Sequence, residues 1–308
     1  MVQVQSLQNQ FLTIKSGQVI LQNLFVIFNM QTLAVLLTVY NRKDKTLECL
    51  KRLYAQLPIE GYQVDIYLTN DGCTDGTPEA VASQYPEVNI INGKGELYWN
   101  RGMYTAWQEA AKKDYDFYMW LNDDTYAYTN MLCALLNASS IKNDRAIIVG
   151  ATQSLNGKNI TYGGRLSNGE IPTPNGELIT IQYFNGNIVL VPRYVYNKLG
   201  NLDYYFTHSK GDFDYGLRAS KAGIDMYQVG ECLGECDLHK SLDKWCNPDV
   251  PLIQRWKMLY RPNGMPPKET FHLERKHNGL LIALFHYITV HIRCLLPFLW
   301  VKLKKAKL

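Results

Sequence analysis

The sequence contains neither of the two common glycine-rich loops that hold phosphate groups. No Gly-x-Gly-x-x-Gly follows the first strand-like run, and no Gly-Lys-Ser or Gly-Lys-Thr occurs anywhere in the 308 residues. Dinucleotide-binding oxidoreductases and P-loop hydrolases use the backbone N–H groups of such loops to bind their ligands. Both classes therefore lose their main support.

Cysteine is too sparse and too scattered for a disulfide framework. Seven cysteines, an odd number in so long a chain, favour a reducing compartment. The apolar stretch 21–29 is short and has no small-residue cleavage site, so it is a poor signal peptide. Residues 1–29 are an N-terminal extension of uncertain status, because Met30 stands just before the first clear strand.

Charged residues make up 19% of the chain and hydrophobic residues 46%, as in an ordinary folded protein. The net charge of +4 is unevenly distributed, because residues 257–308 carry ten Lys or Arg against two Glu. No aromatic-basic RNA signature accompanies this basic tail. An anionic lipid surface is therefore the favoured partner, and no nucleic acid is expected.

Strand-like and helix-like segments alternate along the first half of the chain, which predicts a mostly parallel α/β sheet. The expected strands are 33–41, 64–70 and 116–122, and the expected helices are 42–57, 75–85 and 99–113. In the second half the expected strands are 146–153, 181–192 and 224–230, with a helix at 210–223 and loop or hairpin structure over 154–180.

The apolar run 280–301 is long enough to consider a membrane span. His286, His291, Arg293 and Pro297 interrupt it, and Arg293 would lie deep in a bilayer. An interfacial helix followed by the basic residues 302–305 is the favoured interpretation. A helix packed on the core and a true span remain the alternatives.

Polar side chains follow three of the expected strands. They are Tyr40, Asn41, Arg42, Asp71, Asp123 and Asp124. In open parallel sheets ligands bind at the carboxyl ends of the strands, so these side chains are expected to share one crevice.

The adjacent carboxylates of Asp123 and Asp124 repel each other, so they either face water in a turn or hold a cation. Mg²⁺ typically takes one or two carboxylates together with substrate phosphates, which fits such a pair. Asp71 either belongs to a tight Asp-Gly turn or accepts a hydrogen bond from a nucleobase or ribose.

Asp212 and Asp214 lie near the expected start of a helix, where acids complement the helix dipole. The alternative makes Asp212 a general base whose pKa is raised by nearby acids and partial burial. Arg218 is expected to pair with Asp214 and to keep that acid ionised.

Four motifs together resemble family 2 glycosyltransferases, most closely the bacterial rhamnosyltransferase-like members. They are TVYNR at 38–42, NDGCTDGT at 70–77, NDDT at 122–125 and GDFDYGLRASKAG at 211–223. The resemblance runs from Leu33 to His239. It implies a GT-A-type, Rossmann-like, mostly parallel sheet flanked by helices over residues 30–250. A C-terminal helical, basic and apolar, membrane-associating segment would follow at 251–308.

The resemblance implies a role for each motif. Asp71 would bind the donor's base, Asp124 would be the likeliest metal ligand, and Asp123 would lie near the ribose or the metal. Asp212 would be the catalytic base of a Glu-Asp motif, although Gly211 stands where the Glu is often found.

The remaining implied donor-binding residues are Tyr40, Asn41, Arg42, Trp99, Asn100 and Arg101, of which Arg101 could pair with phosphate charge. A late histidine often binds the metal in related enzymes, and His239 holds that place here. Cys232, Cys236, His239 and Cys246 offer a competing zinc site, although the second pair is irregularly spaced.

The activity implied is that of an inverting hexosyltransferase dependent on Mg²⁺ or Mn²⁺. It would move a sugar from a nucleotide-diphosphate sugar to a hydroxyl of a glycan or lipid-linked glycan in cell-surface polysaccharide synthesis. The enzyme would be cytoplasmic and peripheral on the cytoplasmic face of the inner membrane. A catalytically inactive scaffold of the same fold and a sugar-phosphate nucleotidyltransferase are the alternatives. The oligomeric state is not indicated.

Overall fold

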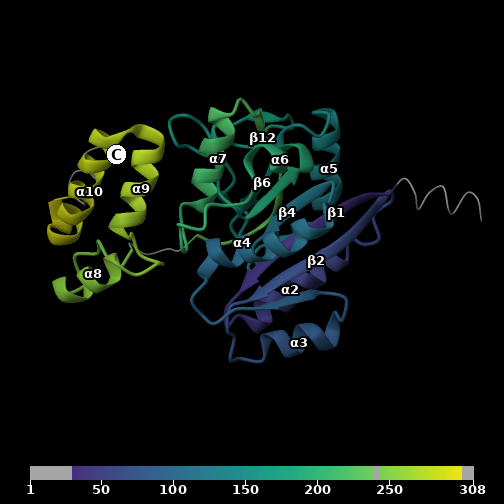
Figure 1. Ribbon diagram of the computed structural model, residues 1–308, viewed down its shortest axis with the longest axis horizontal. Coiled ribbons are helices and arrows are strands. Elements are labelled where there is room, and N and C mark those ends of the chain that lie inside the picture. The colour runs from purple at the N-terminus through teal and green to yellow at the C-terminus, as the bar shows by residue number, and fades with distance from the viewer. Residues whose placement is uncertain (1–29, 239–242, 300–308) are drawn as a thin grey trace, which may run out of the picture.

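The computed structural model describes residues 30–238 and 243–299 (Figure 1). A sheet flanked by helices makes up the larger part. A group of three helices, α8 (Leu252–Leu259), α9 (Pro267–Asn278) and α10 (Leu280–Leu295), lies beside α4 (Tyr98–Ala110) and α7 (Gly211–Lys221) in Figure 1.

The main sheet has the strand order β3-β2-β1-β4-β11-β6-β12-β5. The strands along this path are β1 (Gln31–Val39), β2 (Tyr62–Asn70), β3 (Asn89–Asn92), β4 (Phe117–Leu121), β5 (Tyr126–Ala127), β6 (Ile147–Gln153), β11 (Ile188–Pro192) and β12 (Met226–Glu235). Strands β3, β2, β1 and β4 are mutually parallel, and β12 is parallel to β6. The prediction of a mostly parallel α/β sheet is confirmed.

The sequence did not predict the antiparallel strand in the middle of this sheet. β11 pairs antiparallel with both β4 and β6. It is one half of the run expected as a single strand over 181–192, which a turn divides into β10 (Tyr183–Phe184) and β11. The smaller strands are β7 (Ile160–Tyr162), β8 (Gly164–Arg165) and β9 (Ile179–Thr180), all within the segment expected as loop and hairpin.

Both faces of the sheet are buried, because successive residues of a strand point to opposite sides. On β1, Leu33, Val35 and Leu37 join one core cluster, and Ala34 and Leu36 join the other. The first cluster includes side chains of α2 (Lys43–Tyr54), α3 (Thr77–Gln84) and α5 (Met131–Ile141), and the second includes side chains of α4, α6 (Arg193–Leu199) and α7. Each fully buried leucine contributes about 1.5–3 kcal/mol.

Helix α4 approaches the sheet closely because it has a glycine at the contact. A Cβ on Gly102 would come within 2.0 Å of Thr38 Oγ1 on β1, and Thr69 Oγ1 donates to the Gly102 carbonyl at 2.8 Å. The close approach fixes α4 against β1 and β2, with its first turn near the carboxyl ends of these strands.

Helix α10 occupies 280–295 of the run that was considered as a membrane span or an interfacial helix. No helix in the described part of the chain is both long and apolar enough to cross a membrane. The polar side chains of α10 face the protein: His286 Nδ1 is 2.7 Å from Glu274 Oε1, and the Arg293 guanidinium lies 5.0 Å from the Trp245 ring centroid. The apolar side chains that face outward include Leu281, 82% exposed, and Phe285, 62% exposed.

Candidate functional site

The two aspartates after β4 share one arginine. Arg42, at the start of α2, places Nη1 3.1 Å from Asp123 Oδ1 and 2.7 Å from Asp124 Oδ2. Burial raises the pKa of Asp123 to about 7, against the opposing effect of the Arg42 charge. The sequence left two alternatives for this pair, a turn that faces water or a bound cation. In this structure the positive charge of Arg42 lies against both carboxylates.

The donor atoms at this position suit part of the coordination shell of a divalent cation. Across residues 30–238 and 243–299, no group of three or more His, Cys, Asp or Glu side chains could hold a metal ion. Mg²⁺ nevertheless needs only one or two carboxylates when substrate phosphates supply the other ligands. The carboxylates of Asp123 and Asp124 fit that arrangement, and His239 lies outside the described residues.

The cysteines that suggested the competing zinc site do not come together in a metal-binding group. Among the described residues, Cys232, Cys236 and Cys246 belong to no set of three or more His, Cys, Asp or Glu side chains that could hold a metal ion. Cys236 instead lies beside the aspartate pair, with Sγ 4.0 Å from Asp124 Oδ1, and burial raises the pKa of its thiol to about 12.

Asp71, after β2, is buried and is held by backbone N–H groups. Its carboxylate accepts hydrogen bonds from Gly95, Leu97 and Tyr98, over 2.8–3.1 Å. These bonds fix the turn that leads into α4. The interaction of Asp71 with a nucleobase stays a prediction.

Trp99 connects the aspartate pair to Asp212, the expected general base. Its Nε1 donates to Asn122 Oδ1 at 2.7 Å, immediately before Asp123. Its ring lies against Gly186, where a Cβ would come within 2.6 Å of the indole, and the Gly186 N–H donates to Asp212 Oδ2 at 3.1 Å. Trp99, the Asp123–Asp124 pair and Asp212, which lie far apart in the sequence, thus form one continuous site.

Asp212 has the environment expected of a general base. It is partly buried at the start of α7, where Oδ1 also accepts the Phe213 N–H at 2.9 Å. Burial raises its pKa to about 6, and the two backbone hydrogen bonds oppose that rise. A carboxylate with such a pKa is ionised near neutral pH and is basic enough to accept a proton.

The glycine in place of the expected Glu has a packing reason. A Cβ on Gly211 would lie 1.6 Å from Asn100 Oδ1. Asn100 is fully buried and is held in place because Nδ2 donates to the carbonyls of Asp203 and Phe206 at 2.9 and 2.7 Å. Sequence reasoning noted the departure at Gly211, but no signal in the sequence linked it to Asn100.

The other predicted donor-binding residues lie around this centre. Arg101 Nε donates to the Tyr204 carbonyl at 3.1 Å, so Asn100 and Arg101 both hold the loop before α7. Asn41 Oδ1 accepts the Thr74 N–H at 2.7 Å, and Tyr40 is 55% exposed. Contacts of these four residues with a donor stay predictions.

Asp214 is fully buried and is surrounded by positive or protonatable groups. Arg218 Nε lies 2.9 Å from Oδ2, and Lys276 Nζ and His277 Nε2 lie 2.7 and 2.8 Å from Oδ1. Burial alone would raise the pKa of Asp214, but these partners lower it to about 2. The predicted pairing with Arg218 is confirmed.

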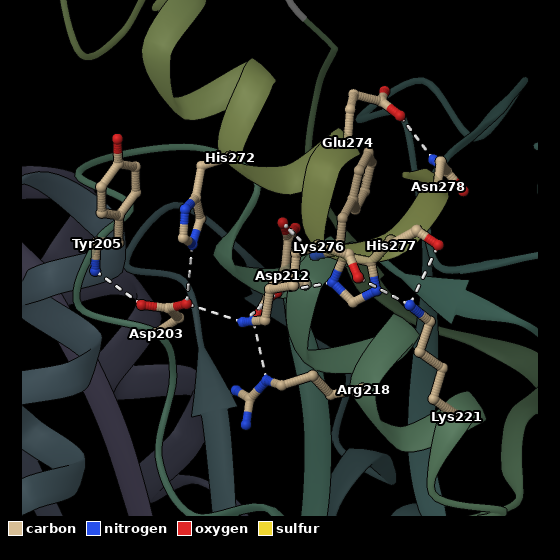
Figure 2. A network of polar contacts seen from close by, with 12 residues as sticks. Asp203, Tyr205, Asp212, Arg218, Lys221, His272, Glu274, Lys276, His277 and Asn278 are labelled. Carbon is tan, nitrogen blue, oxygen red and sulfur yellow. Dashed lines mark hydrogen bonds and ion pairs between the residues drawn. The ribbon is translucent and has the colours of Figure 1, made fainter. Parts of the chain in front are cut away.

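The partners from α9 were not predicted. Figure 2 shows Lys276 and His277 of α9 directed toward α7, and Lys276 Nζ also lies 2.8 Å from Asp203 Oδ2. Lys221 Nζ of α7 donates in turn to the carbonyls of Lys276 and His277 at 3.0 and 3.1 Å. The C-terminal helices are therefore tied to the helix that carries Asp212.

Residues 34–212 match the family model described as "Glycosyl transferase family 2". The matched range contains Asp71, Asp123, Asp124 and Asp212. A search of the curated proteins finds no match.

Three similar solved structures, of two proteins, support the fold. A mannosyltransferase from Pyrobaculum calidifontis in complex with GDP-Man and Mn²⁺ is 16% identical, with a TM-score of 0.52, over 90% of this chain and 79% of that one. S. aureus TarS 1–349 in complex with UDP-GlcNAc is 12% identical, with a TM-score of 0.52, over 83% of this chain and 73% of that one. Against the longer TarS structure the match covers 68% of this chain and 37% of that one, at 12% identity and a TM-score of 0.51.

Proposed function

Because the chain belongs to glycosyl transferase family 2, we propose that it is an inverting hexosyltransferase that uses a nucleotide-diphosphate sugar. The observation that carries the proposal is the continuous site in which Trp99 links the Asp123–Asp124 pair to Asp212. The similar structures that contain UDP-GlcNAc and GDP-Man support a nucleotide-sugar donor. A rhamnosyl donor is one candidate within this class.

In the proposed reaction, Asp212 accepts the proton of an acceptor hydroxyl. The acceptor oxygen forms a bond to the anomeric carbon on the face opposite the nucleotide, and the bond from that carbon to the diphosphate oxygen breaks. The configuration inverts because a single displacement occurs, and the nucleoside diphosphate leaves. The raised pKa of Asp212 supports the role of the base.

We propose that Asp124 and Asp123 hold Mg²⁺ or Mn²⁺, with His239 as a further ligand. Such an ion, when bound, supplies positive charge to the diphosphate leaving group. Arg42 would then be free to exchange its contact with the aspartates for one with the donor. The similar mannosyltransferase structure with Mn²⁺ supports the choice of metal.

The proposed donor contacts follow the carboxyl ends of the strands. Tyr40, Asn41 and Asp71 would lie nearest the nucleoside, at the ends of β1 and β2. Trp99 would contact the transferred sugar, since it lies between the aspartate pair and Asp212. Asn100 and Arg101 would act near the diphosphate by fixing the loop that precedes α7.

We propose that the acceptor is a glycan or lipid-linked glycan of cell-surface polysaccharide synthesis and that the enzyme works at the cytoplasmic face of a membrane. The apolar faces of α8 and α10 support this, with Ile253 74% exposed and Leu281 82% exposed. A hollow of about 330 Å³ is lined by Leu252, Ile253, Trp256, Lys257 and Leu295. The basic residues of the tail complement an anionic surface. The polar groups of α10 face the protein, which leaves its apolar face for lipid.

A thermal-shift screen of nucleoside diphosphates, each with and without Mn²⁺, tests the proposal. A ligand that binds only the folded state raises the melting temperature, and at 100 times its dissociation constant it adds about 2.7 kcal/mol of stability. We expect one nucleoside diphosphate to stabilise the protein, and more strongly with Mn²⁺. The proposal fails if no nucleotide shifts the melting temperature under either condition.

An inactive nucleotide-binding scaffold is the second candidate, and Gly211 in place of the expected Glu is the observation that favours it. A scaffold would pass the thermal-shift screen but would not hydrolyse or transfer the sugar of a bound donor. Consumption of the donor, measured as the release of nucleoside diphosphate, therefore separates the two candidates.

A further inference from the structure

Helix α9 inserts a carboxylate into the loop that precedes the base-bearing helix. Glu269 is 8% exposed, and its Oε1 accepts hydrogen bonds from the backbone N–H and the hydroxyl of Thr207, at 3.2 and 2.8 Å. Thr207 lies five positions before Asp212. A residue from the C-terminal helices thus reaches the neighbourhood of the proposed reaction.

The second carboxylate oxygen of Glu269 takes no part in the hydrogen bonds to Thr207. Oε2 is buried and has no hydrogen-bond partner in the described part of the chain. An unsatisfied buried carboxylate oxygen is costly, and packing does not require it, because a hydrophobic or amide side chain could fill the same space. Such an oxygen is suited to accept a hydrogen bond from a bound ligand.

Lys210 lies three positions after Thr207 in the same loop, and its charge interacts with the Glu269 carboxylate, although no ion pair joins the two in the described part of the chain. It caps α7, with φ at 76°, in the left-handed region that a lysine rarely adopts, and it is only 9% exposed. Its Nζ donates to Ser209 Oγ at 3.4 Å, a long contact for a buried ammonium group. Burial lowers the pKa of Lys210, and the carboxylates of Glu269 and Asp212 act against that decrease.

We propose that Glu269 and Lys210 bind hydroxyl groups of the acceptor sugar and present one of them to Asp212. The inference rests on the proposed function and adds the chemical class that the acceptor side recognises. Neighbouring sugar hydroxyls can donate to the Glu269 carboxylate and accept from the Lys210 ammonium, because each hydroxyl is both donor and acceptor. Adjacent hydroxyls match a carboxylate–ammonium pair better than a single charged group does.

The charges make this an acceptor site. The Glu269 carboxylate repels a diphosphate, so this position favours a neutral hydroxyl-bearing group. The loop is also fixed to the donor side, because the Thr207 carbonyl accepts the backbone N–H groups of Asn100 and Arg101 at 3.2 and 3.4 Å. The C-terminal helices thereby select the acceptor in addition to placing the enzyme at a surface.

The test uses the full chain, the donor identified by the nucleotide screen, and a panel of octyl hexosides as acceptors. Glu269→Gln keeps an oxygen for Thr207 and removes the charge, and Lys210→Gln removes the ammonium group. Glu274→Gln is the matched control, because Glu274 lies on the same helix and pairs with His286 of α10. Melting temperatures show whether each variant is folded, and hydrolysis of the donor by water reports the donor site separately.

Both test variants should raise the KM for the octyl hexoside about tenfold or more, the cost of one charge-assisted hydrogen bond. The dissociation constant for the nucleoside diphosphate should change less than about twofold, and Glu274→Gln should behave as the wild type. Unchanged KM in folded Glu269→Gln and Lys210→Gln would overturn the inference and leave the proposed function standing. Hydrolysis of the donor by water without transfer to any octyl hexoside would likewise overturn the inference and leave the proposed function standing. Loss of nucleotide binding or donor hydrolysis in the wild type would instead remove the proposed function.

Discussion

At the scale of single residues, two aspartates on one turn of α7 behave in opposite ways. Asp212 has a pKa of about 6 because burial dominates, and the opposing effects of backbone N–H groups and of the Arg165 charge are smaller. Asp214 has a pKa of about 2 because Arg218, Lys276 and His277 surround it. The same residue type thus has the raised pKa that suits a proton acceptor at one position and stays ionised at the other.

The activity should therefore depend on the ionisation of Asp212. A general base works only when deprotonated, so kcat should fall about tenfold for each pH unit below about 6. The measurement is kcat with saturating donor between pH 4.5 and about 8, with melting temperatures at each pH as the control. A kcat that stays constant down to pH 4.5 in folded protein would contradict the role of Asp212.

The clash between position 211 and Asn100 predicts a strong coupling. Gly211→Ala should destabilise the protein by about 1–3 kcal/mol, because the new methyl group overlaps the buried Asn100 amide. In an Asn100→Ala background the same change should cost much less, since the nearest remaining atom, Asn100 Cβ, lies at 3.3 Å. A double-mutant cycle by chemical denaturation measures the coupling, and additive effects would contradict the packing explanation.

Most of the candidate site residues could be singled out from the sequence because they follow recognisable strands. Asp71 and Asp123 come after strands that hydrophobic runs mark clearly, whereas Asp212 lies at the start of helix α7. Their packing partners were not predictable, since Asn100 meets Gly211 only through tertiary contacts. The contact between Arg42 and the aspartate pair was likewise invisible in the sequence, although both parts had been identified.

At the scale of secondary-structure elements, the main feature is the attachment of α9 to α7. Lys276 and His277 bind Asp214, and Lys221 binds the end of α9 in return (Figure 2). The short basic stretch in α9 gave no sign of this role. Sequence periodicity shows that a helix forms, but not which buried carboxylate its charges will meet.

Asp214→Asn should destabilise the fold by about 3–5 kcal/mol, because Lys276 and Arg218 would lose their buried counter-charge. The matched control is Glu109→Gln, since Glu109 pairs with Lys112 on the surface and should cost less than about 1 kcal/mol. Equal costs for the two variants in urea unfolding would contradict the importance of the buried network.

The pH dependence of that cost has a definite sign. The lowered pKa of Asp214 contributes stability that is fully present above its unfolded pKa of about 3.9 and is lost as the pH falls toward about 2. The difference in stability between wild type and Asp214→Asn should therefore shrink between about pH 4 and pH 2.

The orientation of α10 is a second property that sequence could not supply. The polar stripe at His286 and Arg293 was evident in the sequence, as was the apolar character of the rest. Which face turns inward depends on Glu274 and Trp245, which pair with that stripe from other segments. The apolar face is consequently left on the outside.

At the scale of the whole molecule, this outward face predicts binding to anionic membranes. The protein should sediment with vesicles that contain phosphatidylglycerol and bind less to pure phosphatidylcholine, because the basic tail needs negative charge. Leu281→Ser/Phe285→Ser should weaken binding while nucleotide-induced stabilisation stays unchanged. Equal sedimentation of this variant and the wild type would contradict the lipid-facing surface, and a change in oligomeric state on light scattering would assign the face to a second copy instead.

Much of the overall architecture was predictable because the first half alternates buried strands with amphipathic helices. The central antiparallel strand β11 was not, since the run 181–192 reads as one continuous strand. A turn at Gly186 and Asn187 divides it, and that turn brings the Gly186 N–H to Asp212. The turn that divides the run 181–192, which was not predicted, thus helps to build the site.

Asp212 is proposed to remove the acceptor proton, and other residues of the same site are proposed to bind the nucleotide. The most direct test compares turnover and nucleotide affinity of the wild type and Asp212→Asn, with the donor identified by the nucleotide screen. Turnover should fall by about 10²–10⁴-fold while the dissociation constant for the nucleoside diphosphate stays within about twofold. Wild-type turnover in a correctly folded Asp212→Asn variant would contradict the account.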